Sequence, residues 1–399
     1  MHNKETYYQG PLHSDLTVDG IVYNYIVSSH HGNSNPTVKD GFDRTWGPFY
    51  YHFNKGKKGS SMESLRKDAL QYYDRSFDAD FYDSIADKVP NYVPTSKRGS
   101  LKLRVNLPEK SSRPLVILTA NGQDFQDNFS DDGKSLQYWQ DIDSNGEVTI
   151  DRIAAGTYRL TIYADGVFGQ YIQDDVKISS RKETTVNAKW NPESNGHELW
   201  RIGTPDKTSG EFRHGYARDP NHPLHPEEYR IYWGAYDFYA DFPDGVNFHV
   251  GKSNESVDFN YVHWGKYNGT NTNDINNWTV TFDLSANDLK QAKTGNAILT
   301  MQLAGAQTAA GNTHHSTSRW GQFDYTVTVN NHDLDPWTIH DYDSSSCALR
   351  SGISCRNLAH KFSFKSGLLK EGSNEMILSI PHGATSCYVQ YDALRLEVS

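Results

Sequence analysis

Two tyrosines and a histidine near the start of the chain are the residues whose types and spacing could do chemistry. Tyr23 and Tyr25 stand two apart in the alternating run "IVYNYIV", so they share one face of a strand. The run ends at His30 and His31, followed by a glycine. Phenols donate and accept hydrogen bonds, and an imidazole changes its charge near neutral pH, so this set could bind a polar ligand and move a proton. By itself, the pattern more often marks a structural strand that runs into a polar loop.

Other motifs give weaker signals. The segment "DIDSNGEVTIDR" places acidic and amide residues at the offsets of a calcium loop, but the twelfth position is Arg152 and the flanks read as strands. A hairpin turn is therefore the better interpretation. The histidines of "HPLHPEEYR" and "NTHHSTSR" have no second set of ligands at a fixed spacing. We predict no metal and no cofactor.

Composition limits the classes of function. The chain has 399 residues, 36% of them hydrophobic and 22% charged, and a net charge of −10. No run of about eighteen apolar residues exists, so we expect no membrane span. The negative charge argues against nucleic acid as a partner, although a basic cleft could hold one acidic sugar. The three cysteines, Cys347, Cys355 and Cys387, allow one disulfide and one spare thiol.

Four Asn-x-Ser/Thr sequons and an excess of tyrosine suggest further properties. The sequons at Asn128, Asn254, Asn268 and Asn277 are compatible with a secreted glycoprotein. The N-terminus "MHNKETYYQG" contains no apolar signal core. The 25 tyrosines suit β-sheets and also surfaces that stack on sugars, and burial in the core is the commoner fate of such rings.

Hydrophobic periodicity divides the chain into three segments. Residues 1–96 begin with strand-like alternation and continue into a helical pattern that starts after Ser60 or Ser61, runs through Leu65 and Tyr73 to Phe77, and breaks by Pro90. Residues 97–190 contain five strands separated by turn residues, which favours a sandwich of fibronectin type III or immunoglobulin type. Residues 191–399 hold short alternating strands without helices, typical of a jelly roll. The predicted fold class is all-β.

Several long segments carry a family resemblance. They are "DGFDRTWGPFYYHFN", "QYWQDIDSNGEVTIDRIAAGTYRLTIYADGVFGQY", "ELWRIGTPDKTSGEFRHGYARDP", "HPEEYRIYWGAYDFYADFPDGVNFHVG" and "YVQYDALRLEV". In this order, over nearly the whole chain, they resemble the fungal rhamnogalacturonan endolyases of polysaccharide lyase family 4. The resemblance implies a large catalytic β-sandwich, of which 1–96 is the C-terminal part, a fibronectin type III-like domain at 97–190, and a jelly roll at 191–399 that is similar to carbohydrate-binding modules.

The resemblance also implies a reaction, β-elimination on the rhamnose–galacturonate backbone of pectin. The C5 proton of a uronate is a poor acid because its carboxylate is already negative. A cation or proton must neutralise that carboxylate, a base must take the C5 proton, and an acid must protonate the leaving oxygen. In this family a lysine and a histidine are credited with the proton transfers, with arginines and tyrosines around the sugar acid and no obligatory catalytic metal.

Residues of this chain match the family's site one by one. His30 matches the catalytic histidine, and Tyr23 and Tyr25 match two substrate-binding tyrosines on the strand before it. Glu5 is a looser match to an acidic substrate contact, because its spacing differs. Strict alternation would instead place His31 on the face of the tyrosines. If His30 is the equivalent of the family's catalytic histidine, the strand must bend or bulge near Ser28 and Ser29.

One departure from the family concerns its catalytic lysine and arginines, which precede the tyrosine strand. Here the only lysine before Tyr23 is Lys4, which is too close to be the equivalent. We therefore expect a fragment or truncated chain of a secreted, extracellular, monomeric enzyme that acts on rhamnogalacturonan I. The alternatives are a non-catalytic pectin-binding protein and a purely structural array of β-sandwiches. In the binding alternative, the candidates for sugar stacking in 191–399 are Trp200, Trp233, Trp264 and Trp320.

Overall fold

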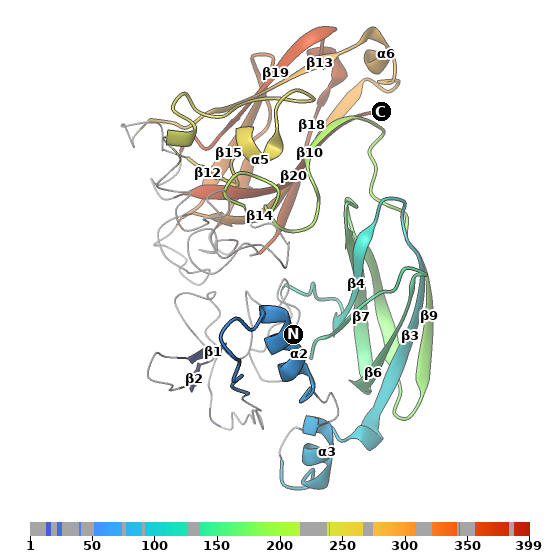
Figure 1. The fold of residues 1–399 in the computed structure, drawn as a ribbon. Coiled ribbons are helices and arrows are strands. Elements are labelled where there is room, and N and C mark those ends of the chain that lie inside the picture. Colours follow the sequence, from blue (N-terminus) through green and yellow to red (C-terminus); the bar gives the residue numbers. More distant parts are fainter. Residues whose placement is uncertain are drawn as a thin grey trace.

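The computed structural model contains two stacked β-structures and a small N-terminal part (Figure 1). The strands of the middle segment lie below those of the C-terminal segment in this view, and the N-terminal helices lie beside the middle segment. The structure describes residues 13–16, 22–25, 40, 52–73, 77–89, 92–126, 136–215, 238, 240–265, 274–308, 321–340, 343, 356–382 and 387–399.

The N-terminal part combines one pair of strands with two helices. Strands β1 (His13–Leu16) and β2 (Val22–Tyr25) form an antiparallel pair. Helix α2 (Met62–Leu70) begins where predicted, because the side chain of Ser61 accepts the N–H of Ser64 at 3.2 Å and satisfies one free donor of the first turn.

The predicted helical face from Leu65 to Phe77 is not one helix. Helix α2 ends at Leu70, and α3 (Phe77–Ser84) is separate from it. Helix α2 buries none of its residues, so no tertiary packing extends it past its second turn.

The middle segment is a β-sandwich, as predicted. After a 3₁₀ turn, η1 (Thr95–Lys97), the strands are β3 (Arg98–Asn106), β4 (Ser112–Ala120), β5 (Tyr138–Asp141), β6 (Glu147–Ala154), β7 (Gly156–Asp165), β8 (Tyr171–Ile178) and β9 (Glu183–Lys189). One sheet has the order β6-β3-β9 and the other β5-β4-β7-β8. Alternate residues of β3 (Leu101, Leu103 and Val105) enter the core between the sheets. Burial of each such side chain stabilises the fold by roughly 1.5–3 kcal/mol.

The C-terminal segment is a second and larger sandwich. Its strands are β10 (His197–Gly203), β11 (Asn247–His249), β12 (Val262–Trp264), β13 (Trp278–Leu284), β14 (Asn296–Gln307), β15 (Phe323–Val329), β16 (His332–Asp333), β17 (Trp337–Ile339), β18 (Leu358–Lys365), β19 (Gly372–Ser379) and β20 (Tyr388–Val398). A five-stranded sheet has the order β10-β20-β14-β18, with β12 also on β20. A six-stranded sheet has the order β11-β13-β19-β15-β16, with β17 also on β15.

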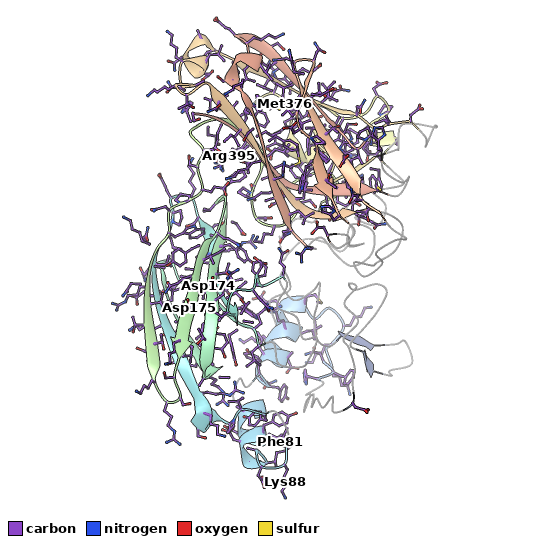
Figure 2. All side chains as sticks on the ribbon, turned by 180° about the vertical axis from the view of Figure 1, so that it is seen from behind. Phe81, Lys88, Asp174, Asp175, Met376 and Arg395 are labelled. Atoms are coloured by element: carbon purple, nitrogen blue, oxygen red, sulfur yellow. The ribbon has the colours of Figure 1, made fainter. Side chains whose placement is uncertain are left out.

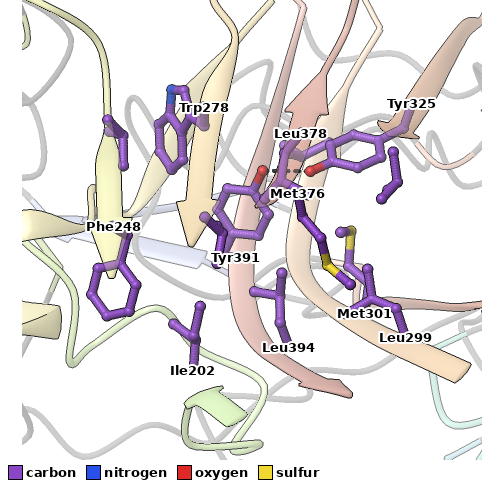
Figure 3. Packing of buried hydrophobic residues seen from close by; sticks show 14 of the residues in the cluster. Ile202, Phe248, Trp278, Leu299, Met301, Tyr325, Met376, Leu378, Tyr391 and Leu394 are labelled. Atoms are coloured by element: carbon purple, nitrogen blue, oxygen red, sulfur yellow. Dashed lines mark hydrogen bonds between the residues drawn. The ribbon is translucent and has the colours of Figure 1, made fainter. Parts of the chain in front are cut away.

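Two details of this segment differ from the sequence prediction. Short helices, α5 (Glu255–Asp258) and α6 (Ala286–Leu289), and a 3₁₀ turn, η4 (Ser366–Leu368), interrupt the strands. Strands β11 and β13 are parallel, whereas the other strand pairs described in this segment are antiparallel. The core between the two sheets is rich in aromatic rings and methionines, several of which are drawn in Figure 3.

The predicted hairpin turn at 141–147 is a turn, but it does not join two strands of one sheet. Strand β5 and strand β6 belong to different sheets, so the turn carries the chain from one layer of the sandwich to the other. Oδ1 of Asp143 accepts the backbone N–H of Asn145 at 2.9 Å and of Glu147 at 2.8 Å. Gly146 takes a positive φ of 77° at the end of the turn. The acidic residue therefore holds its own turn.

The prediction that tryptophans of 191–399 offer surface rings is wrong for two of the four candidates. Trp200 and Trp264 are buried in the C-terminal core, because both lie on strands of the five-stranded sheet and pack toward the other sheet. Trp233 and Trp320 lie outside the described residues. Cys387 is buried, and its thiol donates a hydrogen bond to the carbonyl of Thr308. Cys347 and Cys355 lie outside the described residues.

The helices within the described ranges are short. The longest, α2, has nine residues. None of the described helices is long and apolar enough to cross a membrane.

Candidate functional site

Strand β2 carries the two tyrosines at the centre of the predicted site. The register pairs Tyr25 with His13 and Tyr23 with Asp15 across the antiparallel pair. Of the predicted run, the structure describes the strand Val22–Tyr25. The other two predicted site residues, Glu5 and His30, lie outside the described residues. The backbone register thus pairs each tyrosine with a residue that sequence reasoning did not single out.

A polar cluster follows this pair of strands in the chain. Nε2 of His52 lies 2.8 Å from Oδ2 of Asp68 on α2, and the His52 ring lies 4.6 Å from that of Tyr72. Nδ2 of Asn54 also donates to Asp68 at 3.0 Å and to the carbonyl of Leu65 at 2.8 Å. The hydrogen bond from His52 lowers the pKa of the Asp68 carboxyl. These bonds tie α2 to the segment before it, and the separation of sixteen positions between His52 and Asp68 hid them from sequence patterns.

A first set of contacts joins the two sandwiches. The ammonium of Lys207, in the C-terminal sandwich, lies 5.4 Å from the ring centroid of Phe125 and 5.0 Å from that of Tyr163, both in the middle sandwich. Gln126 and Asn357 exchange two bonds across the same boundary: the backbone N–H of Asn357 donates to Oε1 of Gln126, and Nε2 of Gln126 donates to the Asn357 carbonyl. These contacts hold the two sandwiches together.

Arg395 forms a second contact between the sandwiches (Figure 2). Its guanidinium carbon lies 4.0 Å from the ring centroid of Phe168, and Nη1 donates to the carbonyl of Glu193 at 3.0 Å. Nη2 lies 3.1 Å from the buried carboxylate of Glu397. Burial lowers the pKa of Arg395, and the neighbouring glutamates oppose that shift. Arg395 therefore connects β20 to the linker through the Glu193 carbonyl and to the middle sandwich through the Phe168 ring.

Buried carboxyl groups lie where β20 passes the loop after β10. Oδ1 of Asp392 accepts the backbone N–H of Asp206 at 2.8 Å and of Lys207 at 3.0 Å. Burial, together with the charge of Asp206, raises the pKa of Asp392 to about 8. Burial also raises the pKa of Glu211, whose carboxyl accepts the backbone N–H of Thr204. Across the described part of the chain, no group of three or more His, Cys, Asp or Glu is arranged to hold a metal ion.

The segment "RHGY" contributes a buried ion cluster. Asp241 accepts from Nη2 of Arg213 at 2.5 Å through one oxygen and lies 2.6 Å from Nε2 of His214 through the other. Burial raises the pKa of Asp241, but the bonds from Arg213 and His214 outweigh that effect and the net shift is downward. His214 itself takes a positive φ of 61°. The cluster fastens the loop after β10 to Asp241, which gives this motif a structural role.

Comparison with known proteins identifies the relatives of this architecture. A family model described as polysaccharide lyase family 4, domain II, matches residues 108–186, and one described as polysaccharide lyase family 4, domain III, matches residues 198–396. Together the two models match well over half of the chain. The chain belongs to polysaccharide lyase family 4. The predicted family is therefore confirmed, as are the all-β class, the fibronectin-like middle domain and the C-terminal domain that resembles carbohydrate-binding modules.

Individual members of family 4 align with the entire chain. Rhamnogalacturonate lyase B of Emericella nidulans is 50% identical over 416 aligned positions, which cover 100% of this chain and 62% of the relative. Probable rhamnogalacturonate lyase B of Aspergillus terreus is 50% identical, with 100% of this chain and 63% of the relative covered. Probable rhamnogalacturonate lyase C of Aspergillus oryzae is 49% identical, and the alignment covers 97% of this chain and 57% of the relative. The chain thus spans about three fifths of the length of these curated relatives.

Proposed function

We propose that this protein acts on the rhamnogalacturonan I backbone of pectin and cleaves it by β-elimination as a rhamnogalacturonan lyase. The observation that carries the proposal is the identity of about 50%, over 97–100% of this chain, to fungal proteins named rhamnogalacturonate lyases. Elimination leaves a C4–C5 double bond in the uronate, whereas hydrolysis does not. Ultraviolet absorbance that grows with the number of new chain ends would support elimination, and new reducing ends without absorbance would reject it.

The proposed site is the face of β2 that carries Tyr23 and Tyr25, together with His30 and Glu5. In this proposal the tyrosines bind the sugar through hydroxyls and ring faces, and Glu5 contacts substrate. His30 gives a proton to the leaving oxygen, for which an imidazole with its ordinary pKa of about 6.5 is suited near neutral pH. No resident metal or cofactor takes part.

The proposed division of labour assigns 1–96 to the catalytic sandwich, 97–190 to the middle domain and 191–399 to a domain that holds polysaccharide. The structural role of the middle domain is supported by its contacts through Phe125, Phe168 and Gln126. The alternative, a pectin-binding protein without catalysis, draws on the similarity of 191–399 to carbohydrate-binding modules. Binding of rhamnogalacturonan without any cleavage would favour that alternative.

We further propose an extracellular, N-glycosylated monomer. Two of the four sequons fall within the described residues, and Asn254 and Asn277 are both exposed there. Both amides are also hydrogen-bonded: Asn254 accepts from the N–H of Ser256 at 3.0 Å, and Asn277 accepts from the Ser379 hydroxyl at 2.6 Å. Enzymatic removal of N-glycans from protein secreted by a fungal host should lower its mass, and an unchanged mass would reject glycosylation.

A further inference from the structure

Most arginines of the two sandwiches pair with carboxylates, but three do not. The arginines of the described residues between 92 and 399 that form ion pairs are Arg104, Arg113, Arg159, Arg201, Arg213, Arg356 and Arg395. In the same described ranges, Arg98, Arg152 and Arg181 form no ion pair. Acids outnumber bases in this chain, whose net charge is −10, so three arginines without a carboxylate are not explained by a shortage of acids.

The three arginines lie together around the 3₁₀ turn η1, at the end of the middle sandwich where α3 also lies (Figure 1). The backbone N–H of Arg181 donates to the carbonyl of Arg98 at 2.7 Å, and Nε of Arg181 donates to the carbonyl of Ser96 at 3.1 Å. Nη1 of Arg98 donates to the carbonyl of Arg152 at 2.8 Å. Nη2 of Arg152 donates to the hydroxyl of Thr95 at 2.6 Å. These bonds join β3, β6 and the turn between β8 and β9.

The guanidinium groups at this end keep most of their donors for another partner. A guanidinium has five N–H donors, and the side chains of Arg152 and Arg181 each use one within the described residues. Both residues take a positive φ, 62° and 56°, which is uncommon outside glycine and is often found at binding sites. Lys97 and Lys182, next to Arg98 and Arg181 in the chain, are exposed and also form no ion pair in the described ranges. We call these five cations the basic end.

The acids near the basic end do not neutralise it. Asp83 of α3 accepts the hydroxyl of Tyr92 at 2.6 Å and the backbone N–H of Thr95 at 3.0 Å, so neutral donors occupy its carboxylate. Asp151 and Glu183 flank Arg152 and Lys182 in the chain, and neither forms an ion pair within the described residues. The basic end therefore has more cations than neighbouring acids and is locally positive on a chain that is negative overall.

We propose that the basic end of the middle sandwich is a secondary binding surface for the uronate carboxylates of the pectic backbone. An arginine binds a carboxylate through two parallel N–H donors, and a polymer of alternating rhamnose and galacturonate offers one carboxylate in each repeat. A local positive potential attracts such a polymer to a protein whose total charge repels it. This inference rests on the proposed function, which supplies the identity of the polymer, and it adds a surface outside the tyrosine strand.

The test compares two triple variants with the same change in charge. Rhamnogalacturonan I oligosaccharides are titrated into the 399-residue chain by calorimetry at low salt. The variant Lys97→Gln, Arg181→Gln, Lys182→Gln should bind about tenfold more weakly than the wild type, the combined scale of three exposed ion pairs. The matched control, Arg104→Gln, Lys110→Gln, Lys189→Gln, removes exposed cations toward the far ends of β3 and β9 and should bind almost as the wild type does. Added salt should weaken wild-type binding.

Four outcomes would reject the basic end as a uronate surface. They are a wild type that binds no acidic oligosaccharide, a first variant that binds as the wild type does, a control that loses as much affinity as the first variant, and an equal loss toward a neutral galactan. A first variant that loses affinity for single-stranded DNA but not for the oligosaccharide would assign the surface to nucleic acid instead. Equal thermal unfolding of the three proteins ensures that lost binding reports the surface.

The same titrations separate this inference from the proposed function. Unsaturated ends counted after each titration report cleavage independently of binding. If no unsaturated ends form while the two variants differ as expected, the proposed elimination is rejected and the binding surface stands. If unsaturated ends form while both variants bind as the wild type does, the elimination stands and the surface is rejected.

Discussion

The hydroxyl of Tyr391 donates a hydrogen bond to Nδ1 of His263 at 2.9 Å in the core of the C-terminal sandwich. Nε2 of His263 lies 2.5 Å from the carbonyl of Asn276, which can only accept, so this nitrogen carries the proton. Burial lowers the pKa of His263 to about 3, and the neutral ring therefore presents a lone pair at Nδ1 to Tyr391. The Tyr391 oxygen in turn accepts from the hydroxyl of Tyr325 at 2.6 Å, as Figure 3 shows.

The direction of this chain of bonds predicts an order of stability losses. Tyr391→Phe leaves the lone pair of His263 and the hydroxyl of Tyr325 unpaired, and should lower the free energy of unfolding by about 2–4 kcal/mol, from roughly 1–3 kcal/mol for each unpaired buried group with partial relaxation. Tyr325→Phe removes only the last donor and should cost about 1 kcal/mol. Urea unfolding measures both. Equal losses, or a larger loss for Tyr325→Phe, would contradict the assigned direction.

Asp392 predicts that the free energy of unfolding falls as pH rises toward the folded pKa of this group, about 8. Its folded pKa of about 8 lies far above the value of about 3.9 in an unfolded chain, so between these values the folded state binds more protons than the unfolded state. The free energy of unfolding should therefore fall as pH rises, by up to about 1.4 kcal/mol per pH unit for this group. His263 acts in the opposite sense, but only below pH of about 6.5.

The window from pH 6.5 to 8 isolates the effect of the buried acids. Asp392→Asn, which still accepts the two backbone N–H groups, should flatten the slope there, leaving the part that comes from Glu211. Asp174→Asn is the matched control. The bond from Arg159 lowers the pKa of this exposed acid, so Asp174 titrates below the window. A wild-type stability that stays level or rises across the window would contradict the account.

Arg395 should contribute far more to stability than an exposed ion pair of the same domain. Arg395→Met leaves Glu397 buried without its cation, which typically costs about 3–5 kcal/mol. The control is Lys252→Met, which breaks the exposed pair of Lys252 with Asp283 and should cost less than about 1 kcal/mol. Chemical denaturation gives both values, and similar losses would show that Arg395 does not fasten the sandwiches.

The two adjacent histidines after β2 predict unequal effects on catalysis. His30→Ala should lower kcat by at least about 10²-fold, the usual scale for a lost acid–base group, while His31→Ala should cost much less. Tyr23→Phe and Tyr25→Phe should act mainly on KM, because their proposed role is binding. Initial rates from the absorbance of the double bond give these parameters. The reverse order of the two histidines would show that the proposed register is wrong by one residue.

Sequence patterns predicted local structure well where side chains follow a simple period. The strand pattern of residues 97–190 predicted a sandwich, in which Leu101, Leu103 and Val105 of β3 are buried. Ser60 or Ser61 was the predicted start of α2, and Ser61 is its N-cap. The period could not place the end of α2, since the pattern continues to Phe77 while the helix stops at Leu70. The hydrophobic period also could not distinguish a tryptophan on a sugar-stacking surface from one in the core. Trp200 and Trp264 were therefore wrongly considered as surface rings.

Contacts between distant residues were beyond the reach of sequence patterns. His263 and Tyr391 are 128 positions apart, and Gln126 and Asn357 are 231 apart, so no local spacing marks either pair. The same limit hid His13, which becomes a neighbour of Tyr25 only through the register of β1 and β2. The family resemblance gave the site residues by matching motifs, and the structure adds the strand that pairs with them.

The central claim, elimination on rhamnogalacturonan, is tested most directly by counting two products in one reaction. The 399-residue chain is incubated with rhamnogalacturonan I at high protein concentration, and unsaturated uronates and new reducing ends are quantified together. Elimination predicts one unsaturated end for each new reducing end, at any rate of turnover. Reducing ends without the double bond would mean hydrolysis and would contradict the account.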